Sequence, residues 1–421
     1  MKTRLLAFAI LLTLCSCTKP GTENGGNGNN SNVDNEKPEV VKPVIDKFYK
    51  GTTMCFASYV QDVGLVYRED GKECDPYKSV KAHGANIVRL QLDQCRFEEY
   101  DGVTIDWQSY ERVLADMKKA KAAGLDVFLT LKPDYDKFTS SGADHNNIPE
   151  DWKGQGDSKV GDLLYDWVYG TLDKLYKEGV CPAVVAVGNE VNVGFLKPSA
   201  GSNDASRTGA LLARGFEAVR KFSSDNSEAC AIALHIANPV KAESYTGSIE
   251  AAGGKDYDIL ALSYYPGSNI GHSLPYNSVK TTVEALKRQF GKPVMIVETA
   301  YSFTTGTVGG KWMGDWCNNA YNYPDWDDAA NSVNYTPAKQ REWLHSLAEE
   351  VKAGGGIGVI TWGTESLPDE LTGYSEGHGK KLYTYPAAWA YGSTWENNSY
   401  WDFTNGNNLH EGIDWMGDVS E

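Results

Sequence analysis

Eight short apolar segments, separated by longer stretches of chain, constrain the fold of this protein more than any other feature of its sequence. Each segment is a continuous apolar run rather than a strict alternation, which is typical of parallel strands covered by helices. The runs are Met54–Tyr59, Asn86–Leu92, Leu125–Leu131, Ala183–Val187, Ala231–Ile236, Ile259–Tyr264, Val294–Val297 and Ile357–Trp362. Between them we expect helices at Trp107–Ala123, Asp162–Lys177, Ala205–Phe222, Ser278–Phe290 and Ala338–Lys352. This pattern predicts an α/β fold, a (β/α)8 TIM barrel with extended βα loops. A doubly wound open sheet is the alternative, although no Gly-x-Gly-x-x-Gly motif follows the first run.

The N-terminus has the features of an export signal. Lys2 and Arg4 precede an apolar run at residues 5–14, which is too short to span a bilayer and has the length of a signal-peptide core. The run leads into a Leu-Cys-Ser-Cys sequence that resembles a bacterial lipobox. We therefore expect residues 1–16 to be removed and Cys17 to carry a lipid, and plain secretion is the alternative.

The next segment, residues 17–44, is first rich in Gly and Asn and then in Pro, with almost no apolar content. Such a composition cannot form a core and predicts a flexible tether. Residues 45–421 remain for the predicted barrel. We expect the protein to lie outside the cytoplasm, attached to a membrane only through the lipid. The expected membrane is the outer membrane of a bacterium.

The charge balance restricts the partners of the chain. Lys and Arg number 40 against 56 Asp and Glu, a net charge of −16, and no long basic run is present. Phosphate contacts supply most of the affinity for nucleic acids, so we expect no nucleic-acid partner. A neutral or cationic ligand is favoured instead. The 24 Tyr and 12 Trp could be core residues alone, but they also suit stacking on the sugar rings of a neutral polysaccharide. We expect the chain to act as a monomer.

Polar residues follow the apolar runs, and in a barrel the carboxyl ends of the strands carry the functional groups. These residues are Arg89, Lys132, Asp134, Asn189, Glu190, His235, Tyr264, Tyr265, Glu298 and Trp362. Glu190 and Glu298 each end a run that otherwise holds no charge. A carboxylate in such a place is costly unless it is paired or used.

Two carboxylates that face each other across a cleft are the equipment of a glycoside hydrolase. One carboxylic acid protonates the leaving oxygen, and the other carboxylate attacks the sugar or activates water. Glu190 follows the fourth run and Glu298 the seventh, so a barrel would set them on opposite sides of its mouth. Arg89 is the nearest cation that could favour the ionised form of Glu298, whereas Glu190 needs an apolar setting or a like charge to stay protonated.

Several segments, in chain order from about residue 48 to 410, are similar to glycoside hydrolase family 53, the endo-β-1,4-galactanases, within the clan of retaining (β/α)8 glycosidases. They are Gly84-Ala-Asn-Ile-Val-Arg-Leu, Val187-Gly-Asn-Glu-Val-Asn, Ala233-Leu-His-Ile-Ala-Asn-Pro, Leu262-Ser-Tyr-Tyr-Pro, Lys292-Pro-Val-Met-Ile-Val-Glu-Thr-Ala-Tyr, Gly356-Ile-Gly-Val-Ile-Thr-Trp and Gly392-Ser-Thr-Trp-Glu-Asn. The segments Leu131-Lys-Pro-Asp-Tyr-Asp and Gly363-Thr-Glu depart from the usual pattern of the family.

This resemblance implies endo-acting cleavage of β-1,4-galactan, the type I arabinogalactan of pectin, with retention of configuration. It implies Glu190 as the general acid/base and Glu298 as the nucleophile. Asn189 would hold the sugar 2-hydroxyl, Tyr264 would lie by the nucleophile, and Trp362 would form a sugar platform. Arg89, His235 and Trp395 complete the expected substrate-binding set, although His235 could equally be a core histidine.

Other activities stay open as alternatives. The same clan includes endo-β-mannanases and β-glucanases, and a surface glycan-binding lipoprotein without turnover would share the barrel and the tether. The seven histidines form no His-Glu-x-x-His motif, so we expect no catalytic zinc and no required cofactor. The acidic loop at residues 302–337 could hold a structural calcium or simply be solvated. The six cysteines after Cys17 are either disulfides or buried thiols, with no connectivity evident.

Overall fold

The computed structural model describes residue 43 and residues 45–420, with gaps at 63, 95–97, 101–102, 106–107, 140–141, 200–201, 266–277, 305–334 and 368–395. Contacts divide the chain into Met1–Glu39, which lies outside the described residues, and Val40–Glu421, which holds the fold. The expected signal peptide, lipidated Cys17, most of the tether and most of the acidic loop at 302–337 also lie outside the described residues, as does Trp395. No helix within the described ranges is long and apolar enough to cross a membrane.

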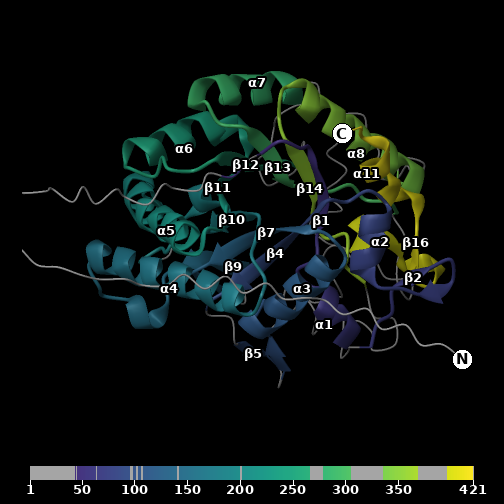
Figure 1. The fold of residues 1–421 in the computed structure, drawn as a ribbon, viewed down its shortest axis with the longest axis horizontal. Coiled ribbons are helices and arrows are strands. Elements are labelled where there is room, and N and C mark those ends of the chain that lie inside the picture. Colours follow the sequence, from purple (N-terminus) through teal and green to yellow (C-terminus); the bar gives the residue numbers. More distant parts are fainter. Residues whose placement is uncertain are drawn as a thin grey trace, which may run out of the picture. The chain divides into compact units, whose positions relative to one another are not determined.

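A closed barrel of eight parallel strands forms the centre of this unit, as predicted (Figure 1). Around the ring each strand pairs with its neighbours in the order β1, β4, β7, β10, β11, β12, β13, β14 and back to β1. The strands are β1 (Tyr49–Thr53), β4 (Ile87–Asp93), β7 (Asp126–Lys132), β10 (Val184–Val187), β11 (Ala231–Ala237), β12 (Ile259–Ser263), β13 (Val294–Glu298) and β14 (Gly358–Thr361).

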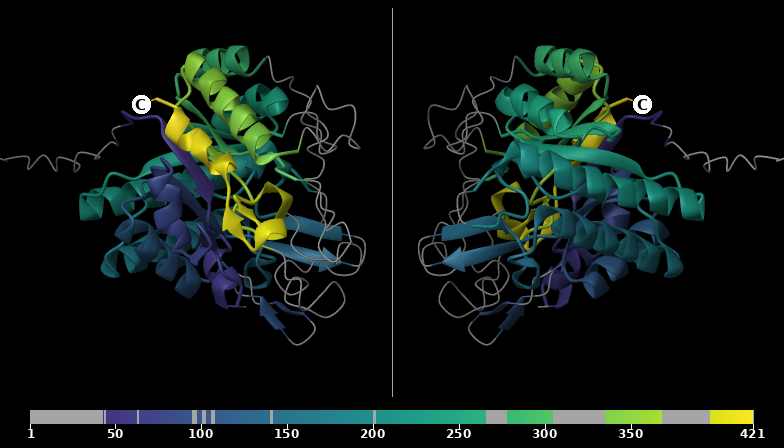
Figure 2. Two further views of the ribbon diagram at one scale, coloured as in Figure 1. Left: turned by 90° about the vertical axis from the view of Figure 1, so that its right-hand side faces the viewer. Right: turned by 90° about the vertical axis from the view of Figure 1, so that its left-hand side faces the viewer.

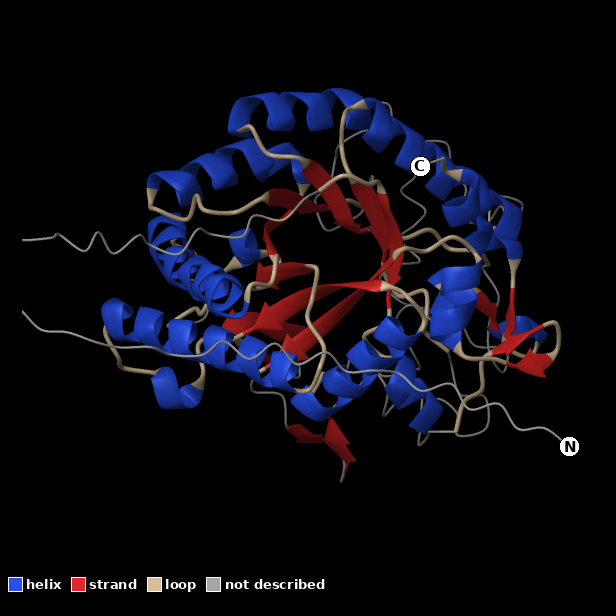
Figure 3. Cartoon of the chain, in the orientation of Figure 1, coloured by secondary structure: helices blue, strands red, loops and turns tan. Residues whose placement is uncertain are grey.

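Helices surround the strands, and Figure 3 shows them as an outer ring. They are α1 (Ala57–Asp62), α2 (Pro76–Ala82), α3 (Tyr110–Ala122), α4 (Asp157–Lys177), α5 (Ala205–Asn226), α6 (Pro239–Ala251), α7 (Val279–Phe290), α8 (Pro337–Ala353) and α11 (Trp415–Asp418). The sequence pattern did not predict α6, because small or polar residues such as Ala242 and Thr246 form much of its buried stripe. Asn238 caps this helix and Pro239 opens it, which is the usual signature of a helix start.

Short antiparallel pairs decorate the barrel. One sheet joins β2 (Arg68–Glu69) and β3 (Lys72–Glu73) to β15 (Trp401–Asp402) and β16 (Asn408–Leu409). A hairpin of β5 (Glu98–Tyr100) and β6 (Val103–Ile105) follows β4, and a hairpin of β8 (Tyr135–Thr139) and β9 (Gly142–Asn147) follows β7. Figure 2 shows both hairpins projecting from the barrel.

Apolar side chains divide into two layers, because successive residues of a strand point to opposite faces. The inner layer fills the barrel and includes Ile87, Phe128, Val184, Ile259 and Met295. A larger layer lies between the strands and the helices. Strands buried on both faces explain why their sequences are continuous apolar runs.

The first strand differs from the prediction. The run Met54–Tyr59 was expected to be a strand, but β1 is the preceding segment Tyr49–Thr53, and Ala57 already begins α1. Lys50 and two threonines hide β1 from a search for apolar runs. Gly51 is required here, because a β-carbon would collide with the backbone of Ile87 on the neighbouring strand.

Candidate active site

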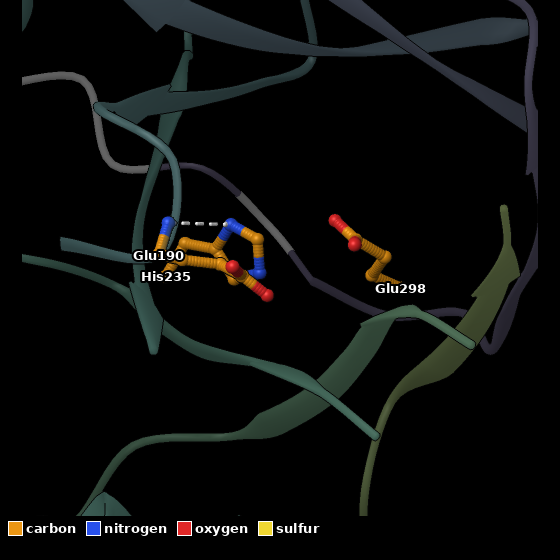
Figure 4. A group of neighbouring side chains, drawn as sticks. All are labelled: Glu190, His235 and Glu298. Atoms are coloured by element: carbon orange, nitrogen blue, oxygen red, sulfur yellow. Dashed lines mark hydrogen bonds between the residues drawn. The ribbon is translucent and has the colours of Figure 1, made fainter. Parts of the chain in front are cut away.

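Glu190 and Glu298 meet at the carboxyl-terminal mouth of the barrel, as the sequence predicted. One carboxylate oxygen of each residue and a ring nitrogen of His235 all lie within 4.8 Å of one another. Figure 4 shows the two carboxylates directed into the same space from opposite sides. Glu298 is 8 % exposed and Glu190 is partly buried, so both are largely shielded from bulk water.

The backbone of Glu190 is held in an unusual conformation. After β10 ends, Gly188 has φ 87° and Glu190 has φ 48° and ψ 52°, the left-handed region that side chains other than glycine rarely adopt. The backbone N–H of Glu190 donates to Nδ1 of His235 at 3.3 Å. This bond supports the turn that carries the carboxylate into the mouth.

A β-bulge directs Glu298 into the barrel. Strand β12 pairs residue by residue with β13 up to Leu262 and Ile296, and then Ser263 pairs with Glu298, which skips Val297. Paired residues of neighbouring strands share a face, so Glu298 lies on the inner face with Ser263. Without the bulge, the alternation would turn Glu298 toward the helices.

Arg89, on β4 inside the barrel, links Glu298 to Asn189, the residue before Glu190. Its Nη1 donates to Oε2 of Glu298 at 2.8 Å, and its Nη2 donates to Oδ1 of Asn189 at 2.5 Å. Its Nε donates to Oγ1 of Thr130 at 3.2 Å. The expected ion pair with Glu298 is therefore confirmed. The hydroxyl of Tyr265 donates to the other oxygen, Oε1 of Glu298, at 3.0 Å, so Glu298 is fixed at both oxygens.

The two carboxyl groups have different surroundings. Burial and then the negative charge of Glu298 raise the pKa of Glu190 to about 7, against the opposing effects of a hydrogen bond from Ser263 and the cations Arg89 and Lys132. Glu298 instead forms a direct ion pair with a buried guanidinium. This asymmetry favours a proton on Glu190 and a charge on Glu298, the division of labour of an acid and a nucleophile.

His235 and Ser263 form a short relay behind Glu190. Burial and then the charge of Arg89 lower the pKa of His235 well below its usual range, so the ring is neutral. Because Nδ1 accepts from the Glu190 backbone, the ring proton lies on Nε2, which donates to Oγ of Ser263 at 2.9 Å. The Ser263 hydroxyl is then left to donate to the Glu190 carboxylate.

Three of the expected substrate-binding residues contact the two glutamates directly. Arg89 is fully buried and His235 is 1 % exposed, so neither side chain reaches the open cleft, and both act on the glutamates instead. Tyr264 lies beside Glu298, as expected, because its backbone N–H donates to the carbonyl oxygen of Glu298 at 2.7 Å. Its ring packs in the layer under the helices with Leu262, and the tyrosine hydroxyl that contacts the carboxylate is that of Tyr265.

Asn189 and Trp362 lie where a sugar could contact them. Oδ1 of Asn189 accepts from Arg89 and, at 3.2 Å, from Gln91, which orients the amide group so that Nδ2 is turned away from both. Trp362 follows β14 and is partly exposed, with the Arg89 guanidinium 5.4 Å from its ring centroid. Phe56 supports it edge to face at 6.3 Å. Trp395 lies outside the described residues.

Sequence reasoning missed the residues that hold this site in place. Gln91, Thr130 and Ser263 are uncharged and lie inside apolar runs, so their composition gave no signal. Glu365 was also missed: it is fully buried beside β1, where its carboxylate accepts from Oγ1 of Thr53 at 3.1 Å. Burial raises the pKa of Glu365 to about 7. Counting alternate residues along each strand would have placed Ser263 on the inner face.

Glu190, His235 and Glu298 are also the types of residue that bind metals, and their spacing would fit an ion. Their present partners suit a different use. Both nitrogens of His235 are in hydrogen bonds, and both oxygens of Glu298 accept from protein donors. A metal would have to replace these contacts, so the arrangement fits a carboxylate pair better than a metal centre.

The barrel has eight parallel strands, with one glutamate just after the fourth strand and one at the end of the seventh, and the two face each other at the carboxyl ends. These features define a glycoside hydrolase of the two-carboxylate class. Comparison with known proteins narrows this class to one family. The chain belongs to glycosyl hydrolase family 53, whose model matches residues 49–413.

Named relatives agree with this membership. The chain is 29 % identical over 368 residues to an arabinogalactan endo-β-1,4-galactanase of Cellvibrio japonicus, covering 86 % of this chain and 88 % of the relative. It is 28 % identical over 351 residues to an endo-β-1,4-galactanase of Bacillus subtilis, covering 82 % and 76 %. Among solved structures, the GH53 catalytic domain of Ignisphaera aggregans superposes with a TM-score of 0.69 at 22 % identity, covering 90 % of this chain and all of that one. This last likeness confirms the fold.

Proposed function

We propose that this protein is an endo-β-1,4-galactanase that cleaves the galactan of type I arabinogalactan with retention of configuration. The observation that carries the proposal is the spacing of Glu190 and Glu298, whose nearest carboxylate oxygens lie within 4.8 Å. Retaining enzymes place their carboxyl groups about 5–5.5 Å apart, whereas inverting enzymes leave about 6.5–9.5 Å for a water molecule. The names of the family relatives supply the galactan.

In the first step, a carboxylate oxygen of Glu298 attacks the anomeric carbon while the bond to the leaving sugar oxygen breaks. Glu190 gives its proton to that oxygen, and a covalent glycosyl-enzyme remains. Arg89 and Tyr265 orient Glu298 for the attack through one hydrogen bond to each oxygen. Their positions also keep the carboxylate from rotating away from the sugar.

In the second step, Glu190, now ionised, takes a proton from water, and the water oxygen attacks the anomeric carbon and releases Glu298. The loss of negative charge on Glu298 in the intermediate removes the repulsion that favoured the protonated form of Glu190. The pKa of Glu190 therefore falls, and its ionised carboxylate can act as the general base. Asn189 would bind the sugar 2-hydroxyl through Nδ2, and Trp362 would stack on a sugar face.

The test is incubation of the purified protein with β-1,4-galactan, β-mannan and β-glucan, followed by separation of the oligosaccharides. We expect oligosaccharides from galactan only, released first as the β anomer by NMR. Products from mannan or glucan would favour another activity of the clan. Intact polysaccharides that still bind the protein would favour a glycan-binding lipoprotein without turnover.

We also propose that the protein is exported and that a lipid on Cys17 anchors it to a bacterial membrane, by expectation the outer one. The basic residues and the apolar run before Cys17 support this proposal. Cys17→Ala should abolish incorporation of labelled fatty acid and release the protein from the membrane fraction. Retention of the label in this variant would contradict the proposal.

We propose that the enzyme is active as a monomer without a required cofactor, because the reaction proposed above needs only the carboxyl groups of Glu190 and Glu298 and water. Dialysis against EDTA should leave the rate on galactan unchanged. A structural calcium in the acidic loop would instead appear as a lower melting temperature after EDTA, restored by added calcium.

A further inference from the structure

Two cysteines lie together at the end of the barrel opposite the carboxylate pair. Cys181 lies between α4 and β10, and Cys230 immediately precedes β11. Strands β10 and β11 are parallel neighbours, with Val184 paired to Ala231, so the two cysteines enter adjacent strands from the same edge. Their sulfur atoms are 3.5 Å apart.

The surroundings hold both sulfurs toward each other. Sγ of Cys230 lies 3.2 Å from the carbonyl oxygen of Pro182, and Sγ of Cys181 lies 3.8 Å from the same oxygen. The separation exceeds a disulfide bond of about 2.05 Å by about 1.5 Å, which small rotations of the two side chains would close.

One of the two sulfurs is open to a reagent. Cys230 is fully buried, but Cys181 is only partly buried and lines a cavity of about 780 Å³ together with Met117, Tyr176 and Glu228. An oxidant could therefore reach Cys181 first, with Cys230 placed behind it as the second thiol. This is the arrangement of an attacking and a resolving cysteine.

We propose that Cys181 and Cys230 form a disulfide bond that joins β10 to β11 at the base of the barrel. The thiolate of Cys181 attacks a disulfide of the oxidant, forms a mixed disulfide and releases one thiol. Cys230 then loses its proton, attacks the sulfur of Cys181 and displaces the second thiol. Two protein thiols become one disulfide, and the disulfide of the oxidant becomes two thiols, which take up the two protons.

The bond is expected to act on stability and not on catalysis. It closes a loop that contains β10 and α5, and a cross-link over such a loop restricts the unfolded chain. The catalytic glutamates lie at the far end of the same strands, so their geometry does not depend on the bond. The hydrogen bond to Cys230 and burial raise the pKa of Cys181, so oxidation should be faster at alkaline pH than at neutral pH.

The test uses the full chain, incubated at pH 8.5 with oxidised glutathione and then alkylated without reduction. Peptide mass spectrometry should find the peptides of Cys181 and Cys230 linked, two hydrogens lighter than their sum, and separated by dithiothreitol. Alkylation of both cysteines after this treatment, in folded protein, would overturn the proposal. This measurement needs no variant, so a folding defect cannot obscure it.

Variants then separate the bond from general packing. The melting temperature of the oxidised wild type should exceed that of its reduced form by roughly 3–6 °C, and dithiothreitol should not shift the melting temperature of Cys181→Ser. Cys74→Ser serves as the control, because it removes a partly buried thiol elsewhere and should keep the full difference. Activity on galactan should agree within twofold among the three proteins at 25 °C. An equal dithiothreitol shift in Cys181→Ser would contradict the proposal.

Discussion

The two ends of the barrel interior have opposite chemistry although the same eight strands build them. At the amino ends, residues such as Ile259, Val184 and Met295 fill the interior with apolar atoms. At the mouth, Glu298 ends β13 and Glu190 follows β10, and the buried Arg89 reaches Glu298 from within β4. Close packing alone can hold the apolar side chains in place, whereas each buried charged group at the other end needs a hydrogen-bond or ion-pair partner. Stability and reactivity are therefore separable along each strand.

The strongest way to break this division is to remove the proposed nucleophile. Glu298→Ala should lower the kcat for galactan by more than about 10⁴-fold, because it removes the carboxylate that forms the glycosyl-enzyme in the proposed mechanism. Polysaccharide binding, measured by affinity electrophoresis, should remain. Glu284→Ala, on the outer surface of α7, is the control and should keep full activity. Full activity in Glu298→Ala would overturn the assignment.

Removal of the acid/base should have a smaller effect that chemistry can repair. Glu190→Ala should lower kcat on galactan by about 10²–10⁴-fold, and far less on aryl galactosides whose leaving groups need no protonation. Added azide should restore turnover and give the β-galactosyl azide, since a small anion needs no general base. A correctly folded variant that azide does not rescue would count against this role.

The apolar end should respond in stability and not in rate. Ile259→Ala, which opens a cavity low in the barrel, should cost about 2–5 kcal/mol in the free energy of unfolding. Urea denaturation measures this cost, and the kcat at 25 °C should stay within twofold of the wild type. A large loss of kcat in the folded variant would show that the two ends are coupled.

The pH profile tests the proton on Glu190. Its pKa is raised to about 7, so the general acid is present below pH 7 and is lost as the pH rises. The kcat/KM for galactan should fall tenfold per pH unit above about pH 7. With an activated aryl galactoside, whose leaving group needs no acid, this fall should be weaker. A fall in kcat/KM that begins near pH 4.5 instead would mean that burial does not raise the pKa of Glu190.

The smallest expected effect concerns the relay behind Glu190. Ser263→Ala removes the hydrogen bond that lowers the pKa of Glu190, so the alkaline limb should move to higher pH. It also leaves Nε2–H of His235 without its acceptor, and we expect kcat to fall by about 3- to 10-fold. Ser223→Ala, at a buried serine on α5, should leave the profile unchanged. An unchanged profile in Ser263→Ala would exclude the relay.

The sequence predicted the barrel well because its strands are buried on both faces, which leaves a visible apolar run at seven of the eight. It failed at β1, where Gly51 is needed for close approach to β4 and the neighbouring residues Lys50, Thr52 and Thr53 are polar. The positions of Glu190 and Glu298 followed from their places at strand ends. The bulge that turns Glu298 inward could not be predicted, because it depends on how β12 and β13 align.

Supporting contacts were harder to predict than charged residues. Tyr264 and Tyr265 follow β12 and point to opposite faces of the sheet. Counting alternate residues from Ala261, which points into the barrel, would have predicted that Tyr265 contacts Glu298. The cysteine pair was hidden for a different reason. Cys181 lies three residues before β10 and Cys230 only one before β11, so their proximity depends on the path of the intervening turn.

The left-handed backbone at Glu190 has a consequence for how this enzyme would change under selection. An L-residue in that region costs roughly 1–2 kcal/mol, a penalty that glycine escapes and asparagine largely escapes. Glu190→Gly and Glu190→Asn would therefore relax the turn while deleting the acid. A laboratory selection for thermal stability alone would tend to enrich such inactive variants. Any effort to stabilise this protein therefore has to measure galactan cleavage in each round of selection.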